Sequence, residues 1–175
     1  MPIFQDCGGE IAVSRASMLL DTGVFLNAFA RTNISAEERE YALFMLNNPS
    51  DFHVDQWLVP SAVIVEAWGH LSSSKFRDTG GVGQKTLMEF VQSVTNAIDV
   101  IRCTDDVGEI GEIVKEHRVD VVDAILARLA ERISEQCELK PGIRIATLDT
   151  SDFHKLKQEM GAAFRVFNAR TLEDE

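Results

Sequence analysis

The stretch Met18-Leu19-Leu20-Asp21-Thr22-Gly23-Val24-Phe25-Leu26 decides the fold. It sets a short apolar run directly before an acid, and apolar residues then recur at helical spacing. That order predicts a buried strand that passes straight into a helix. Trp57–Val59 followed by Ala62–Leu71 repeats the arrangement. The chain therefore alternates strands with helices.

The rest of the sequence continues this alternation. Ser35 with Glu38 forms a capping box for a second helix, which ends at Asn47-Asn48-Pro49. The glycine-rich stretch Ser72–Gly83 is predicted to be a loop, and residues 1–17 show no period and receive no assignment. Further helices are predicted over 87–94, 107–114, 120–136 and after Asp152, and strands over 98–101, 143–148 and 163–167.

This pattern predicts an α/β fold of three layers, α/β/α, with a mostly parallel central sheet, because parallel strands need crossover connections. The 175 residues, 45% of them hydrophobic, suit a single domain over 1–175. We expect a cytoplasmic protein with no membrane partner, since no apolar run spans a bilayer and no signal-peptide pattern is present. The three cysteines show neither disulfide nor zinc spacing.

Two acids follow predicted strands. Asp21 comes after Met18–Leu20, and Asp149 comes after the strand over 143–148. Ligands of such sheets bind at the carboxyl ends of the strands, so these two carboxylates are candidates for function. The alternative is structural, because Asp21 is also placed to cap a helix and Asp149 to form a turn or cap. The residues alone leave both interpretations open.

Two further acids stand on predicted helices. Glu66 is the only acid or strong base in Trp57–Leu71, a stretch that we expect to be largely buried, so it needs a cation, a hydrogen-bond partner or a raised pKa. His70, one turn later, is the alternative partner. Asp120 and Asp123 resemble a capping box at a helix start, where one acid suffices as the cap and the other is left free.

Four converging carboxylates would repel one another unless divalent cations lay between them. Ligand sets made only of oxygen favour Mg²⁺ or Mn²⁺ over zinc. Two such ions can activate a water for in-line displacement at phosphorus, which is how many nucleases work. The net charge of −11 provides no global attraction for nucleic acid, so such a ligand would need a local basic path.

The sequence resembles the PIN domain family of metal-dependent ribonucleases, which includes toxins of toxin–antitoxin pairs. The matching motifs are Leu19-Leu20-Asp21-Thr22, Val59-Pro60-Ser61 leading to Glu66, Val122–Ala127, and Ala146–Phe153. The resemblance implies an endoribonuclease that binds Mg²⁺ (or Mn²⁺). It assigns the catalytic and metal-binding acids as Asp21, Glu66, Asp123 and Asp149, with Thr22, Thr147, Asp152 and Asp120 in auxiliary roles.

The same resemblance implies an RNA substrate, single-stranded or looped, a homodimer, and an antitoxin protein as a possible partner. Gly23 departs from the family, whose members often carry Asn there. Extra residues fall in 1–17, 31–56 and 72–84; the last of these segments carries Lys75 and Arg77, and Lys85 follows directly after it. These three basic residues are candidates for RNA phosphate contacts or serve only solubility.

Two other functions fit parts of the sequence. Asp21-Thr22-Gly23 is also the signature triplet of aspartic proteases, but those enzymes are all-β and Asp21 here leads into a helix. A non-catalytic PIN-like module that binds a protein through its acidic surface is the other alternative.

Overall fold

Within the part of the chain that the structure describes, the central sheet has six strands in the order β5-β4-β3-β6-β7-β8. The computed structural model describes residues 2–6, 9–73, 75–76, 80–93, 97–98 and 104–175. The first five strands of the sheet run parallel, and β8 pairs antiparallel with β7. In chain order the strands are β3 (Ser17–Leu20), β4 (Gln56–Pro60), β5 (Ala97–Ile98), β6 (Ile143–Thr147), β7 (Phe164–Asn168) and β8 (Glu173–Asp174).

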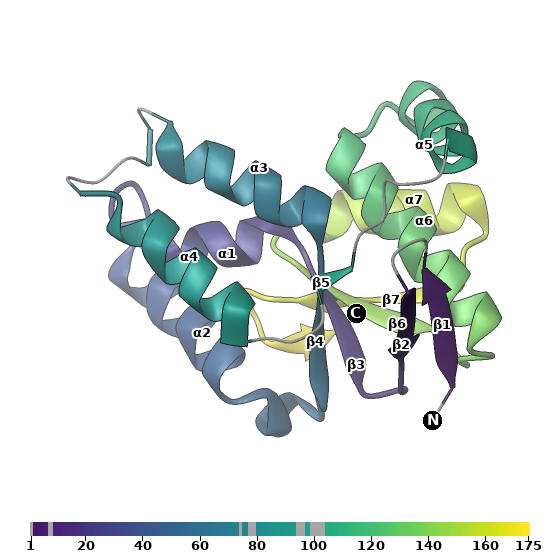
Figure 1. Ribbon diagram of the computed structural model, residues 1–175, viewed down its shortest axis with the longest axis horizontal. Coiled ribbons are helices and arrows are strands. Elements are labelled where there is room, and N and C mark those ends of the chain that lie inside the picture. The colour runs from purple at the N-terminus through teal and green to yellow at the C-terminus, as the bar shows by residue number, and fades with distance from the viewer. Residues whose placement is uncertain (1, 7–8, 74, 77–79, 94–96, 99–103) are drawn as a thin grey trace.

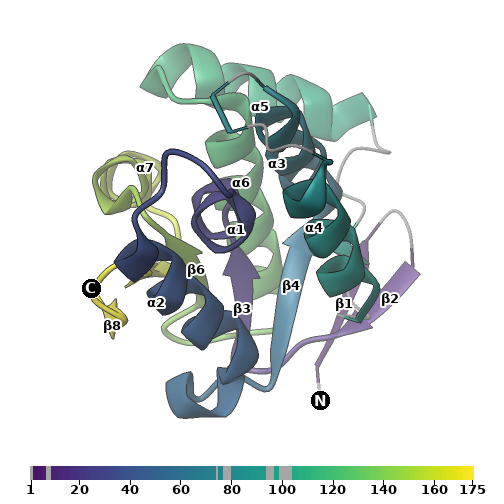
Figure 2. The same cartoon turned by 90° about the vertical axis from the view of Figure 1, so that its left-hand side faces the viewer.

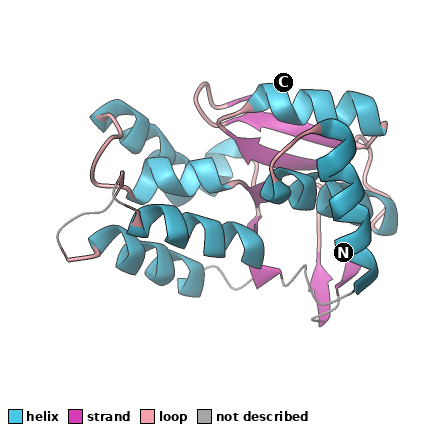
Figure 3. Ribbon diagram, turned by 90° about the horizontal axis from the view of Figure 1, so that it is seen from above, coloured by secondary structure: helices cyan, strands magenta, loops and turns pink. Residues whose placement is uncertain are grey.

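Helices cover both faces of this sheet. Figure 2 shows α2 in front of the strands and α6 behind them, and Figure 3 shows strands between helices from above. The predicted three-layer α/β/α fold with a mostly parallel sheet is confirmed. The helices are α1 (Thr22–Phe29), α2 (Ala36–Asn47), the 3-10 helix η1 (Pro49–Phe52), α3 (Ser61–Ser72), α4 (Val82–Ser93), α5 (Thr104–His117), α6 (Val121–Gln136) and α7 (Thr150–Met160).

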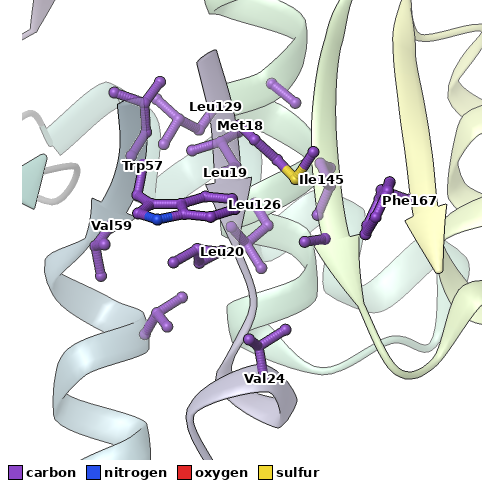
Figure 4. Close-up of a cluster of buried hydrophobic side chains, with 14 of the residues drawn as sticks. Met18, Leu19, Leu20, Val24, Trp57, Val59, Leu126, Leu129, Ile145 and Phe167 are labelled. Carbon is purple, nitrogen blue, oxygen red and sulfur yellow. The ribbon is translucent and has the colours of Figure 1, made fainter. Parts of the chain in front are cut away.

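Strand β3 lies at the centre of the core. All four of its residues are buried, and in the register Met18 lies opposite Trp57 of β4, while Leu19 lies opposite Ile145 of β6. Figure 4 shows these side chains packed together with Leu126 of α6. Burial on both faces explains why the deciding stretch reads as a continuous apolar run instead of an alternating one.

The first seventeen residues, which received no assignment, add a hairpin. Strands β1 (Ile3–Asp6) and β2 (Gly9–Ala12) pair antiparallel in a sheet of their own, seen beside α6 in Figure 1. Phe4 is fully buried, and the Gln5 backbone N–H donates to Gln136 Oε1 at 3.2 Å. The hairpin therefore packs against the side of α6.

Some boundaries differ from the sequence predictions. Helix α4 begins at Val82, inside the predicted glycine-rich loop, and includes Gly83, which is buried so close to the Phe29 carbonyl oxygen that a Cβ would lie 2.6 Å from it. Helix α7 begins at Thr150, so Asp152 lies within its first turn and does not precede it. The capping box of Ser35 and Glu38 is confirmed. Of the predicted strand over 98–101, only Ile98 lies within the described residues.

No helix in the described parts of the chain combines the length and apolar character that a membrane span needs.

The turn before β6 contains Gly142, whose φ of +116° is rarely adopted by other residues. A Cβ there would meet the carbonyl oxygen of Ala163 at 1.9 Å. Glycine is therefore required where β6 enters the sheet beside β7.

Candidate active site

The order of the strands reverses at β3. Strand β4 pairs on one side of β3, and β6, which is later in the chain, pairs on the other. Asp21 follows β3, and its backbone N–H donates to the Ala146 carbonyl of β6 at 3.0 Å. Asp149 stands two residues after the end of β6. Both acids therefore lie where ligands bind in open α/β sheets, as the sequence predicted.

Asp21 is a buried carboxylate with 8% of its surface exposed. Its Oδ1 accepts from the Thr22 backbone N–H at 2.6 Å, and its Oδ2 accepts from the Thr147 hydroxyl at 2.8 Å. Asp21 is thus also the N-cap of α1, the structural alternative considered for it. Burial raises the pKa of Asp21 from 3.8 to about 6, against the lowering effect of these hydrogen bonds, and the charge of Glu66 raises it further.

Asp123 lies in the first turn of α6, and Asp120 is the cap of that helix. The Asp120 Oδ1 accepts from the Val122 backbone N–H at 2.8 Å. The carboxylate of Asp123 is therefore free of the capping role, as predicted. Burial raises the pKa of Asp123 from 3.8 to about 7, and nearby negative charges add to this effect; they belong to Asp21, Asp120, Asp152 and Glu66.

Glu66 lies on α3 with its side chain 27% exposed. The expectation that Trp57–Leu71 is largely buried holds for β4 and was wrong for α3. The reason is that α3 buries only the stripe of Val63, Ala67 and Leu71 and leaves its outer face in solvent. The Glu66 Oε2 accepts from the Thr22 hydroxyl at 2.5 Å. His70, the alternative partner, has its Nε2 3.9 Å from Oε1, which is beyond hydrogen-bond length.

Asp149 is the exposed acid of the four. Its Oδ1 accepts from the Ser151 hydroxyl at 2.7 Å, in keeping with the predicted turn role. Its backbone N–H donates to the Thr147 hydroxyl oxygen at 3.0 Å. Because the same hydroxyl donates to Asp21, Thr147 joins the residues that follow β3 and β6. The auxiliary threonines thus contact the predicted acids directly.

The predicted phosphate-contacting residues do not contact the four acids directly in the part of the chain that the structure describes. Lys75 Nζ lies 4.9 Å from the centre of the Phe76 ring, which makes an edge contact with the His70 ring. His70 in turn lies 3.9 Å from Glu66, so a series of neighbouring side chains, His70 and Phe76, connects Glu66 with Lys75. Lys85 is exposed and pairs with Glu89 at 3.8 Å, and Arg77 lies outside the described residues. Phe76, which the sequence analysis missed, is recognisable only as an aromatic residue beside a lysine in a polar loop.

The donor set of this site consists of carboxylate and hydroxyl oxygens. Asp21 and Asp123 both have raised pKa values, and neighbouring acids contribute to each shift, an arrangement that a divalent cation would relieve. Within the described residues, no three acid, histidine or cysteine side chains stand close enough together to hold a metal ion as they are now oriented. Glu66 and Asp149 instead face Thr22 and Ser151.

A family model described as the PIN domain matches residues 18–158, and the chain belongs to that family. PIN domains are generally nucleases, and they generally use divalent metals. The aspartic protease alternative is wrong, because the fold is α/β. Comparison with curated proteins found no match. The structure is also similar to the crystal structure of FitAcB from Neisseria gonorrhoeae, at 17% identity over 87% of this chain and 97% of that chain, with a TM-score of 0.48.

Proposed function

We propose that this PIN domain is an endoribonuclease that hydrolyses RNA phosphodiesters with Mg²⁺ or Mn²⁺. Its acids would be Asp21, Glu66, Asp123 and Asp149, with Thr22, Thr147, Asp120 and Asp152 in support. The observation that carries the proposal is the pair Asp21 and Asp123, whose pKa values are raised to about 6 and about 7, in both cases chiefly by burial and further by neighbouring acids: Glu66 for Asp21, and Asp21 among others for Asp123. A protein core gains nothing from such a pair, so its chemistry supports a bound cation.

The residues of the chain would share the work as follows. Thr147 holds the Asp21 carboxylate in one orientation, and Thr22 does the same for Glu66. Asp120 caps α6, which keeps Asp123 free and aligned. When bound, a divalent ion lowers the pKa of a water and stabilises negative charge on a phosphoryl oxygen.

RNA is the proposed substrate because Asp21 and Asp149 follow adjacent strands at the carboxyl end of the sheet, and Asp21 is buried there with Asp123 part-buried. Single-stranded or looped RNA can bend a phosphate toward recessed groups, whereas a duplex presents its backbone on a stiff surface. Of the predicted basic residues, Lys75 is proposed to contact the phosphate, because Phe76 and His70 connect it with Glu66. With a net charge of −11, binding should depend on such local cations and weaken with salt.

The test is cleavage of end-labelled single-stranded RNA in Mg²⁺, in Mn²⁺ and in EDTA. The wild type should cut with metal only, and Asp21→Asn should lose at least about 100-fold in rate, since a lost ligand forfeits several kcal/mol of charge stabilisation. Asp51→Asn is the matched control, because it removes the same charge from an exposed position on η1. Equal cleavage by wild type and Asp21→Asn would contradict the proposal.

A protein-binding role is the second candidate, and one surface favours it. A depression of about 460 Å³ on α2 is lined by Tyr41 and Phe44, both more than 40% exposed, and by Glu37 and Glu40. Such an aromatic and acidic surface suits a protein partner. An antitoxin and a homodimer, which the family resemblance implies, stay predictions. If no RNA is cleaved under any metal condition, this second role becomes the better proposal.

A further inference from the structure

Two arginines lie side by side near the amino ends of β6 and β7, away from the acids. Arg144 and Arg165 are paired in register on these parallel strands, so their side chains share one face of the sheet. Arg144 is 5% exposed and Arg165 is half-buried. Two adjacent guanidinium groups that are poorly hydrated require negative charge nearby. The chain as a whole has more acids than bases, with a net charge of −11.

The protein satisfies these guanidinium groups only in part. Arg144 donates from Nη1 to the Phe52 carbonyl and from Nη2 to the His53 carbonyl, both at 2.9 Å, but its buried Nε has no partner among the described residues. Arg165 donates from Nε to the Gly142 carbonyl at 3.2 Å. Within the described residues, the other donors of Arg165 make no hydrogen bond.

The facing negative charge comes from β8, the last strand. Asp174 Oδ2 lies 3.9 Å from Nη1 of Arg144 and 3.9 Å from Nη1 of Arg165. Its carboxylate therefore stands between both cations but beyond hydrogen-bond length from either. Burial lowers the pKa of Arg144, and the charge of Arg165 lowers it further, while Asp174 and Asp55 act in the opposite direction.

Strand β8, which carries Asp174, is a short strand at the edge of the sheet. It consists of the exposed Glu173 and Asp174, paired with β7 at two positions and visible at the sheet edge beside the C-terminus in Figure 2. Glu175 adds an ion pair to His154 at 3.0 Å. Glu175 also accepts from Asn168 Nδ2 at 2.5 Å, and its backbone N–H donates to the Val166 carbonyl at 2.9 Å. Exposed ion pairs contribute little, and β8 pairs with β7 at two positions where β6 and β7 pair at five, so β8 is held less firmly than its neighbours.

We propose that Arg144 and Arg165 form an oxoanion-binding site for a phosphate group, with Asp174 as an internal stand-in. A phosphate carries more negative charge than a carboxylate, and its several oxygens can accept from both guanidinium groups at once. Binding would displace the Asp174 side chain outward, where it is half exposed already. The inference is independent of RNA cleavage, because none of the four acids takes part.

The test is calorimetric titration of inorganic phosphate at constant ionic strength. Wild type should bind measurably, and Asp174→Asn should bind roughly two- to fivefold more tightly, since one competing exposed ion pair is removed. Arg165→Gln should weaken binding at least about tenfold. Arg15→Gln is the matched control, because Arg15 is exposed and its loss changes the net charge equally. Thermal melting of each variant checks that it is folded.

Two results would overturn the site. One is no phosphate binding by folded Asp174→Asn, and the other is equal weakening by Arg15→Gln and Arg165→Gln, which would show a general charge effect. The source of the phosphate follows from a second arm, titration of a short single-stranded RNA in EDTA. Weaker RNA binding by Arg165→Gln, with competition by phosphate, identifies a backbone phosphate as the ligand. RNA binding that Arg165→Gln leaves unchanged, with phosphate binding lost, identifies a free phosphate.

Discussion

Replacing Asp21 by Asn should stabilise the metal-free protein at neutral pH. The Asp21 carboxylate is buried, and its raised pKa of about 6 shows that the fold disfavours the charged form. Asn keeps an oxygen that can accept from the Thr22 backbone N–H and carries no charge. The variant would thus lose the proposed activity and gain stability, a trade that is common at functional sites.

The size and the pH dependence of this gain follow from the pKa. A rise from 3.8 to about 6, at 1.36 kcal/mol for each pKa unit, corresponds to about 3 kcal/mol. Between these pH values the folded protein binds more protons than the unfolded chain, so stability falls as pH rises through that window. The whole cost is present above about pH 6 and is absent below pH 3.8. The gain from Asp21→Asn follows the same curve.

The assay is denaturant and thermal unfolding of both proteins in EDTA between pH 4 and pH 8. At pH 7 we expect a gain of about 1–3 kcal/mol, since the amide is itself buried, which corresponds to roughly 3–10 °C in a chain of this size. The gain should vanish near pH 4. Asp149→Asn, at an exposed acid, should change stability by under about 0.5 kcal/mol. Destabilisation by Asp21→Asn at pH 7 would refute the reasoning.

Three other outcomes are expected. Mn²⁺ should raise the Tm of the wild type and leave that of Asp21→Asn unchanged in the same scan. Gly142→Ala should cost roughly 3 kcal/mol or more in denaturant unfolding because its Cβ would meet a carbonyl at 1.9 Å, whereas Gly161→Ala, with positive φ but open space, should cost roughly 1–2 kcal/mol. Ser134→Ala should cost about 1–3 kcal/mol, since the buried Ser134 hydroxyl accepts from the Ile143 N–H at 3.0 Å; no change in Tm would contradict this.

Sequence reasoning succeeded where local pattern and tertiary structure agree. The run ending at Leu20 is apolar because β3 is buried on both faces, and an acid directly after such a strand has to lie at the sheet edge. Ser35 with Glu38 was readable because a capping box links residues three apart, and Asp120 was readable because an N-cap acid accepts from a backbone N–H of the first turn. The positions of Asp21 and Asp123 in the fold followed from these local rules.

It failed where the answer depends on which surface a neighbour covers. Val65 and Trp68 look like core residues, yet they are 72% and 41% exposed because nothing in the described chain packs on that side of α3. The β1–β2 hairpin was missed because it pairs only with itself and packs on a helix more than 100 residues later. Strand β8 is two acidic residues, and its position beside β7 has no local signal.

The Thr147 hydroxyl connects two of the proposed acids, Asp21 and Asp149, but not Glu66. Asp21 and the backbone of Asp149 are tied to one another through it, and the strands beneath them are hydrogen-bonded, so their spacing is set once the sheet has formed. Glu66 accepts a single hydrogen bond from the Thr22 hydroxyl, and it stands on α3, a helix that buries only one stripe of residues. The position of Glu66 therefore depends on how α3 packs, and a substitution beneath that helix is expected to move Glu66 relative to Asp21 without altering any of the proposed acids.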